Sequence, residues 1–349
     1  MNVLIRAILL SLLLAGTARA EDGYDLWLRY RPVEHAWLKR YLPAATEIVA
    51  EERSPGILAA RGELERGLSG MLWHAVPVRR EISEDGAVVI GTPAKSRLIA
   101  ALHLPLSRAG NEGFLLRSTV LKGRNVTIIT GNTDVGVLYG AFAFLRLIQT
   151  RQPIEHLNIV SAPKIELRIL DHWDNLDGSV DRGYAGRSIW HWSDLPEKLD
   201  PRTIDYARAN ASIGINGAAL NNVNADPAIL TGPYLEKVAA LADLFRPYGI
   251  RVYLSARFSA PIDIGGLKTA DPLDPQVIAW WKAKADEIYR LIPDFGGFLV
   301  KANSEGQPGP QDYHRTHADG ANMLADVLKP HGGIVMWRAF VYSSAVPED

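Results

Sequence analysis

The chain has 349 residues, of which 47% are apolar, and its formal net charge is -1. This length and composition are enough for two domains with apolar cores, and they exclude a chain that is disordered throughout. The near-neutral charge, without a basic run, argues against a nucleic-acid partner. The absence of cysteine excludes disulfide bonds, cysteine-ligated zinc and thiol catalysis.

The N-terminus has the pattern of a secretory signal peptide. A cation precedes an apolar run over residues 7–16, and a small-residue cleavage motif ends at Ala20. The run is too short to span a bilayer, and a polar segment follows it directly. We therefore expect residues 1–20 to be removed and the protein to be exported, to the periplasm or outside the cell. The alternative is an N-terminal membrane anchor.

Residues 21–160 are expected to form a small α/β domain of their own. Three short apolar runs predict strands at 87–91, 114–118 and 125–130. An amphipathic pattern predicts a helix over 136–149, with Thr133 or Asp134 as its N-terminal cap. No cluster of chemically active residues stands out in this part of the chain.

From residue 161 the pattern changes to strands that alternate with helices. Five runs begin apolar and end polar or aromatic, at 165–175, 215–225, 250–258, 296–305 and 333–342. The stretches between them predict helices at 233–245, 275–291 and 318–328. This order implies parallel strands, and in a (β/α)8 TIM barrel the C-terminal strand ends carry the active site. We expect residues 161–349 to be such a barrel, truncated after about five strands; an open five-stranded sheet is the alternative.

The stretch GFLVKANSEGQPGP, residues 297–310, places Lys301, Asn303 and Glu305 at every second position. In a strand these three side chains would share one face. A carboxylic acid that donates a proton at neutral pH needs a raised pKa, and a partly apolar pocket at the barrel mouth would supply it to Glu305. The alternative is an exposed loop glutamate.

Two cations at neighbouring strand ends, Lys301 and Arg338, indicate an anionic ligand. A carboxylate is the simplest choice, because arginine can bind it through two parallel hydrogen bonds and lysine acts as a point charge. A structural salt bridge with Glu305 or another acid is the alternative.

Residues 171–192 form the segment that is densest in acids and aromatic rings. Its four aspartates do not have the spacing of a calcium-binding EF-hand loop, and the histidines form no paired-ligand pattern, so no metal site is predicted. Aromatic rings at a strand end, such as Trp173, suit stacking on sugar rings, although Trp190 and Trp192 fit a core equally well. The asparagines of NNVNA, residues 221–225, either bind sugar hydroxyls or shape a turn.

These segments together resemble a known family. The stretches HWDNLDGSVDRGYAGRSIWHW, NNVNA, TADPLDPQVIAWW to GQPGP and WRAFVY are similar to those of the xylan α-glucuronidases of glycoside hydrolase family 67. The resemblance runs from about Tyr24 to the end and covers the N-terminal and partial barrel portions. Asp171 and Asp181 depart from it, since Asn and Glu are expected there. It implies a hexosaminidase-like N-terminal domain without catalytic residues, a barrel, and a helical C-terminal domain that mediates dimerisation, which is expected but absent here.

The resemblance also implies an activity. Such an enzyme removes glucuronic acid, or its 4-O-methyl ether, from the O2 of the terminal non-reducing xylose of xylo-oligosaccharides, with inversion and without a metal or organic cofactor. Glu305 matches the general acid, and Lys301 and Arg338 match residues that hold the uronate carboxylate. Trp173 matches a wall of the sugar pocket, and Val223 matches the residue that faces the 4-O-methyl group. Three further sugar-binding candidates are Asn175, Asn222 and Asn303.

The second catalytic group is not expected within the chain. In the family, an Asp and a Glu that follow the WRAFVY strand act as the base, and both would lie beyond Asp349. We therefore expect this chain to be inactive alone. One alternative is a remnant that binds acidic xylo-oligosaccharides without cleaving them. Another is a hydrolase for a different uronic or acidic hexosamine glycoside.

Overall fold

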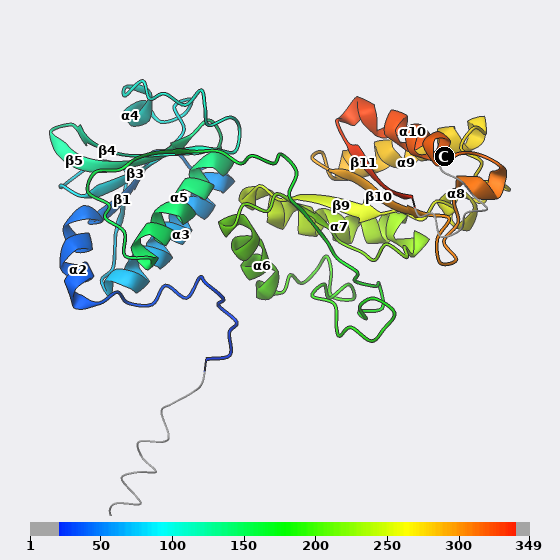
Figure 1. Ribbon diagram of the computed structural model, residues 1–349, viewed down its shortest axis with the longest axis horizontal. Helices are drawn as coiled ribbons and strands as arrows, with labels where there is room; N and C mark the ends of the chain where they lie inside the picture. The colour runs from blue at the N-terminus through cyan, green and yellow to red at the C-terminus, as the bar shows by residue number, and fades with distance from the viewer. Residues whose placement is uncertain (1–20, 340–349) are drawn as a thin grey trace, which may run out of the picture.

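The computed structural model describes residues 21–339. The expected signal peptide and the last residues of the fifth strand-like run lie outside this range. The described residues form a six-stranded sheet and a five-stranded sheet, each with its own apolar core. Figure 1 shows these two parts side by side along the long axis of the molecule.

The N-terminal sheet is mostly parallel, with the strand order β2-β1-β3-β5-β4-β6. Its strands are β1 (Glu47–Ala50), β2 (Val78–Arg79), β3 (Ala87–Gly91), β4 (Phe114–Leu121), β5 (Arg124–Gly131) and β6 (Asn158–Ser161). Only β4 runs antiparallel to its neighbours β5 and β6. The three strands expected from the sequence correspond to β3, β4 and β5, whereas β1, β2 and β6 were not predicted.

Helices cover both faces of this sheet. They are α2 (His35–Tyr41), α3 (Pro55–Leu72), α4 (Arg97–Ala100) and α5 (Asp134–Gln149). Alternation along β3 divides the core: Val88 and Ile90 face the layer of α3 and α5, whereas Val89 faces α4 on the other side (Figure 1). The expected helix is α5, and the hydroxyl of Thr133 caps it by accepting the Gly136 N–H at 3.3 Å.

The second sheet consists of five parallel strands in the order β11-β10-β9-β8-β7. They are β7 (Ile169–Asp171), β8 (Gly217–Ala219), β9 (Arg251–Ser255), β10 (Gly297–Ala302) and β11 (Ile334–Ala339). Each lies within one of the five predicted runs but is shorter than it. The sheet is curled into half of a barrel, and among the described residues its outer strands β7 and β11 each pair on one side only. The closed eight-stranded barrel stays a prediction.

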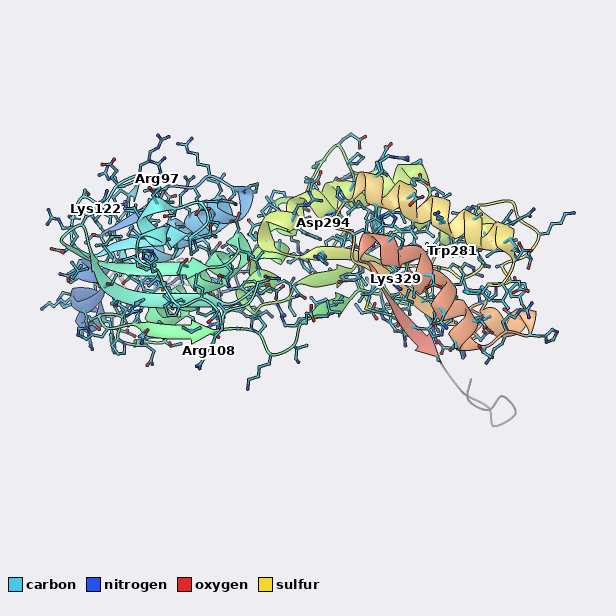
Figure 2. The ribbon with its side chains drawn as sticks, turned by 90° about the horizontal axis from the view of Figure 1, so that it is seen from above. Arg97, Arg108, Lys122, Trp281, Asp294 and Lys329 are labelled. Carbon is cyan, nitrogen blue, oxygen red and sulfur yellow. The ribbon has the colours of Figure 1, made fainter. Side chains whose placement is uncertain are left out.

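One face of this half-barrel is covered by helices. The helices are α6 (Pro201–Ser212), α7 (Gly232–Phe245), α8 (Ala260–Asp263), α9 (Pro275–Leu291) and α10 (His317–Leu328). Figure 2 shows α9 and α10 lying over the same side of the sheet, where Phe298 and Val300 of β10 join the large core. Single 3-10 turns occur at Leu42–Ala44, Pro227–Leu230, Arg246–Tyr248, Pro310–Tyr313 and Lys329–His331. Within residues 21–339, no helix is both long and apolar enough to cross a membrane.

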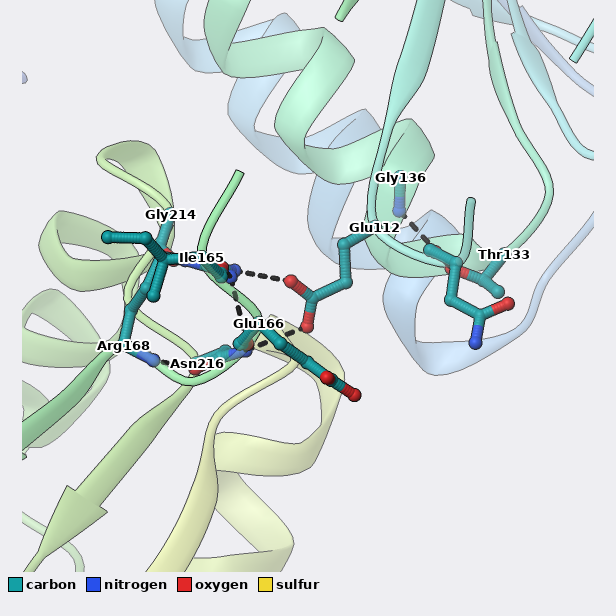
Figure 3. Close-up of polar contacts among 9 residues, drawn as sticks. Glu112, Thr133, Gly136, Ile165, Glu166, Arg168, Gly214 and Asn216 are labelled. Atoms are coloured by element: carbon teal, nitrogen blue, oxygen red, sulfur yellow. Dashed lines mark hydrogen bonds and ion pairs between the residues drawn. The ribbon is translucent and has the colours of Figure 1, made fainter. Parts of the chain in front are cut away.

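Polar contacts join the two parts at the N-terminal ends of the barrel strands. Glu112, from the loop before β4, forms an ion pair with Arg168 and accepts a hydrogen bond from the Asn216 side chain at 2.9 Å (Figure 3). Arg168 directly precedes β7, and Asn216 directly precedes β8. A second pair, Glu63 on α3 with Arg208 on α6, is buried. The opposite ends of the strands are therefore left for the site.

Candidate active site

The C-terminal ends of the barrel strands bring the predicted cations together. Lys301 on β10 and Arg338 on β11 are direct register partners in two parallel strands. Their side chains therefore project from the same face of the sheet, the face opposite the helices. On this face a small apolar layer, which includes Val223 and Leu299, packs against Trp173. Two cations and one aromatic ring thus share the concave side of the half-barrel.

Lys301 is buried and firmly held. Its side chain is 1% exposed, and its ammonium donates to the Oδ1 of Asn224 at 2.8 Å and to the Oε2 of Glu305 at 2.5 Å. A buried charge needs such partners because burial removes its hydration. Asn224 lies in the loop after β8 and is one of the asparagines of NNVNA, which were expected to bind sugar hydroxyls or shape a turn. The loop after β8 and the loop after β10 therefore fix this cation together.

Glu305 has an environment different from the one expected. Its side chain is 44% exposed rather than enclosed in an apolar pocket. The Oε1 atom accepts a hydrogen bond from the Nη2 of Arg182 at 2.9 Å, while Oε2 accepts from Lys301. The hydrogen bond from Lys301, and then that from Arg182, lower the pKa of Glu305 below its ordinary value. The prediction of a raised pKa is therefore wrong, because the two cations favour the ionised carboxylate.

The alternation from Lys301 to Glu305 also ends earlier than predicted. Strand β10 stops at Ala302, and both Asn303 and Glu305 have positive φ angles, of 50° and 49°. Asn303 faces the following loop, where its Oδ1 accepts the Gln311 N–H at 3.1 Å. The three residues therefore do not share a strand face. Asn303 shapes the loop in this structure, and its expected sugar contact stays a prediction.

Arg338 lies over the aromatic wall of the site. Its guanidinium carbon is 5.7 Å from the centre of the Trp173 ring, within the range of a cation–π contact. The indole N–H of Trp173 donates to the Oδ2 of Asp171 at 3.3 Å. These contacts link the ends of β7 and β11, the two outer strands of the half-barrel. Trp173, which was expected to stack on a sugar ring, therefore lies beside Arg338, which was expected to bind the carboxylate of that sugar.

Asn175 and Asn222 hold a loop in this structure. The side-chain NH2 groups of both residues donate to the backbone carbonyl of Asp181, each at 2.9 Å. Asn222 also donates to the Oδ1 of Asn175 at 2.9 Å. They thus attach the long loop after β7 to the end of β8. A role of either residue in sugar binding stays a prediction.

Three further residues of this loop, Trp190, Trp192 and Asp174, have structural roles. Trp190 and Trp192 are buried in the core between sheet and helices, as the simpler interpretation had it, and Trp190 donates to the Leu220 carbonyl at 2.9 Å. Asp174 accepts the Ile189 N–H at 3.1 Å. Within the described range, no group of three or more His, Asp or Glu side chains is placed to hold a metal ion.

Arg182 is the residue of the site that sequence reasoning missed most clearly. It lies 123 positions before Glu305, on the loop after β7, and its side chain is 58% exposed. A single arginine in a polar loop carries no signal of its own. Only the fold shows that the loops after β7 and β10 meet.

Comparison with known proteins assigns both parts of the chain. The model of the glycosyl hydrolase family 67 N-terminus matches residues 26–144, and that of the family 67 middle domain matches residues 147–349. Alpha-glucuronidase A of Emericella nidulans is 42% identical over 347 residues, which cover 96% of this chain and 40% of that protein. The probable alpha-glucuronidase A of Neosartorya fischeri is 42% identical over 337 residues, which cover 96% of this chain and 39% of that protein. The chain thus spans about 40% of the length of the curated relatives it matches.

Solved structures of glycosidases share the fold at low sequence identity. A family GH115 4-O-methyl-alpha-glucuronidase with specificity for decorated arabinogalactans superposes with a TM-score of 0.53 and 15% identity, over 82% of this chain and 39% of that one. The structure of CpGH84D gives a TM-score of 0.54 and 14% identity, over 86% of this chain and 47% of that one. At these identities the likeness concerns the fold alone.

Proposed function

The chain belongs to glycosyl hydrolase family 67, and on that premise we propose that it forms the N-terminal and barrel part of an α-glucuronidase. The substrate is a xylo-oligosaccharide that carries glucuronic acid, or its 4-O-methyl ether, on the O2 of its terminal non-reducing xylose. The enzyme hydrolyses this α-linkage with inversion. The signal-like segment 1–20 supports an exported enzyme, and we place any dimer contact in the C-terminal region of the longer relatives.

One observation carries this proposal: Lys301 and Arg338 share the concave face of the half-barrel beside Glu305 and Trp173. A uronic acid has a carboxylate on a pyranose ring. The guanidinium of Arg338 can bind that carboxylate through two hydrogen bonds, and the Lys301 ammonium adds a point charge. We assign the Trp173 ring to the apolar wall for the sugar and Val223, which is buried in the loop after β8, to the position that faces the 4-O-methyl group.

The chemistry proposed for Glu305 is general acid catalysis. Protonated Glu305 gives its proton to the departing xylose oxygen while a second carboxylate removes a proton from the attacking water. In inverting glycosidases the two carboxyl groups are roughly 6.5–9.5 Å apart, which leaves room for that water. We assign the second carboxylate to the part of the longer relatives that this chain does not span. The chain alone should then bind the acidic sugar without hydrolysing it.

Calorimetric titration with D-glucuronate and with D-glucose tests the sugar-acid site. The two sugars differ only at C6, so tighter binding of glucuronate measures recognition of the carboxylate. Equal affinities would contradict the proposal. Incubation with an acidic xylo-oligosaccharide tests whether this chain supplies a catalytic base, with Glu305→Gln as the control. Release of glucuronate by the unmodified chain, absent in the control, would show that a base is present. Binding without release, also in longer forms of the protein, would favour a non-catalytic binding protein.

A further inference from the structure

The two oxygens of the Glu305 carboxylate have different partners. Oε2 accepts a hydrogen bond from the buried Lys301, and Oε1 accepts one from Arg182, which reaches across from the loop after β7. Lys301 is one of the two cations to which we assign the sugar carboxylate. Arg182 approaches Glu305 from a different loop, the one after β7. A bound sugar carboxylate would therefore take Lys301 from Glu305, whereas Arg182 would stay hydrogen-bonded to Glu305.

The loop that carries Arg182 is held in place at the residue before it. The Asp181 carbonyl accepts hydrogen bonds from both Asn175 and Asn222, and the Asp181 N–H donates to the Trp173 carbonyl at 2.8 Å. Asp181 itself has a φ of 58°, a conformation that needs such support in a residue other than glycine. Three hydrogen bonds to the Asp181 backbone thus fix the position of the adjacent Arg182 backbone, from which its exposed side chain extends.

We infer that Arg182 is a positioning residue that holds Oε1 of Glu305, so that Oε2 becomes the proton-carrying oxygen once an acidic sugar takes over Lys301. The inference deepens the proposed function and rests on it for the identity of the ligand. Arg182 is not proposed to touch the substrate. It acts only through Glu305.

The proton balance of this step is simple. A sugar carboxylate that binds Lys301 replaces Glu305 as its partner and brings a like charge close to Glu305. Oε2 then takes one proton from water and later gives it to the leaving oxygen. Oε1 is the carbonyl oxygen of the protonated acid and still accepts the hydrogen bond from Arg182. Arg182 therefore keeps the acid in place after Lys301 has changed partner.

Among residues 21–339, two charged groups contribute to the pKa of Glu305, which makes its titration simple to interpret. They are Lys301 from β10 and Arg182 from the loop after β7, and Asp181 lies next to Arg182. The experiment is a 13C NMR titration of the glutamate carboxyl groups in the full chain, with the Glu305 signal assigned through Glu305→Gln. It is run on the unmodified chain with and without D-glucuronate, and on the variants Arg182→Gln, Arg182→Lys and Arg187→Gln.

Arg187 is the matched control, because it is an exposed arginine on the same loop without a hydrogen bond or ion pair to Glu305. We expect the titration midpoint of Glu305 to rise in Arg182→Gln and to stay unchanged in Arg187→Gln. Arg182→Lys keeps the charge and should stay near the unmodified value, which guards against a folding defect. Equal midpoints in Arg182→Gln and Arg187→Gln would overturn the inference.

The glucuronate arm separates this inference from the proposed function. Glucuronate should raise the Glu305 midpoint in the unmodified chain, and the Glu305 signal should broaden or split in Arg182→Gln with glucuronate, because the carboxyl has then lost both anchors. A Glu305 midpoint that responds to Arg182→Gln but not to saturating glucuronate would support the Arg182–Glu305 interaction and refute the sugar acid as ligand. A Glu305 signal that stays equally sharp in glucuronate-bound Arg182→Gln would refute the positioning role.

Discussion

Lys301 and Arg338 are register partners on neighbouring parallel strands, so two cationic side chains project from adjacent positions of one sheet face. Like charges this close disfavour one another unless anions lie between or beside them. Glu305 lies against Lys301, and both the Trp173 ring and the Asp171 carboxyl lie near Arg338. A bound sugar carboxylate would interact favourably with both cations, and this attraction is the physical basis of the proposed specificity.

Lys301→Gln should weaken glucuronate binding by about 10- to 100-fold, because a hydrogen bond to a charged group contributes about 1.5–3 kcal/mol. The control is Lys329→Gln, which removes an exposed lysine on the outer helical layer (Figure 2). Calorimetry on both variants checks the prediction. If the two variants bind glucuronate equally well, Lys301 is not part of the ligand site.

Glucuronate binding should become tighter as the pH falls from neutral toward about pH 5. In the free chain, Lys301 and then Arg182 lower the pKa of Glu305, and a sugar carboxylate at Lys301 would raise it again. Binding then takes up a proton, so affinity rises as the pH falls through the bound-state pKa and levels off below the free-state pKa. Glu305→Gln should remove this pH dependence. A pH-dependent affinity that persists in that variant would point to another group.

The buried pair between Arg208 on α6 and Glu63 on α3 should stabilise the junction of the two parts. Arg208 donates from Nε and Nη2 to the two carboxylate oxygens, at 2.8 Å and 2.9 Å. Arg208→Met leaves the buried Glu63 to Arg66 and the Tyr30 hydroxyl, and we expect it to cost about 1.5–3 kcal/mol of unfolding free energy. Arg202→Met on the same helix is exposed and should cost far less. Chemical unfolding of both variants measures this difference in unfolding free energy. Equal stabilities would show that the Arg208–Glu63 pair does not stabilise the junction.

Gly297→Ala should separate β10 from β11. Gly297 has a φ of 133°, and a Cβ there would lie 1.9 Å from the Ile334 carbonyl oxygen, which is backbone and cannot move alone. We expect a loss of more than about 2 kcal/mol in stability. Gly266→Ala is the control, since its φ of 71° is also positive but no atom lies within 4 Å of the added Cβ. A similar loss of stability in both variants would show that backbone strain, and not the clash with Ile334, causes the effect.

The barrel part of the fold was predictable because its signals are local. Helix α9 begins and ends where the sequence indicated, since Asp274 caps it and Pro275 occupies its first position. Helix α3, in contrast, was missed. Its glycines lower the helical propensity, yet a Cβ at Gly56 would lie 2.7 Å from Asp134, and one at Gly67 would lie 2.6 Å from Leu145. Close packing of α3 on α5 therefore requires the residues that hide the helix in the sequence.

The site was predictable in its components but not in its contacts. Spacing on the strands was enough to place Lys301 and Arg338 on one face, because register follows from the alternation of side chains. The environment of Glu305 was not predictable, since its left-handed backbone and its bond to Arg182 depend on two loops that meet only in the folded chain. Exposed loop cations carry no periodic signal.

The most direct test of the account is a calorimetric comparison of two xylo-oligosaccharides, identical except that one carries 4-O-methylglucuronic acid on its terminal non-reducing xylose. Because the proposed site is built from Lys301, Arg338 and Trp173, the acidic oligosaccharide should bind at least about tenfold more tightly than the neutral one. Arg338→Gln should remove most of that difference. Equal binding of the two oligosaccharides would contradict the assignment of this face to a uronic acid.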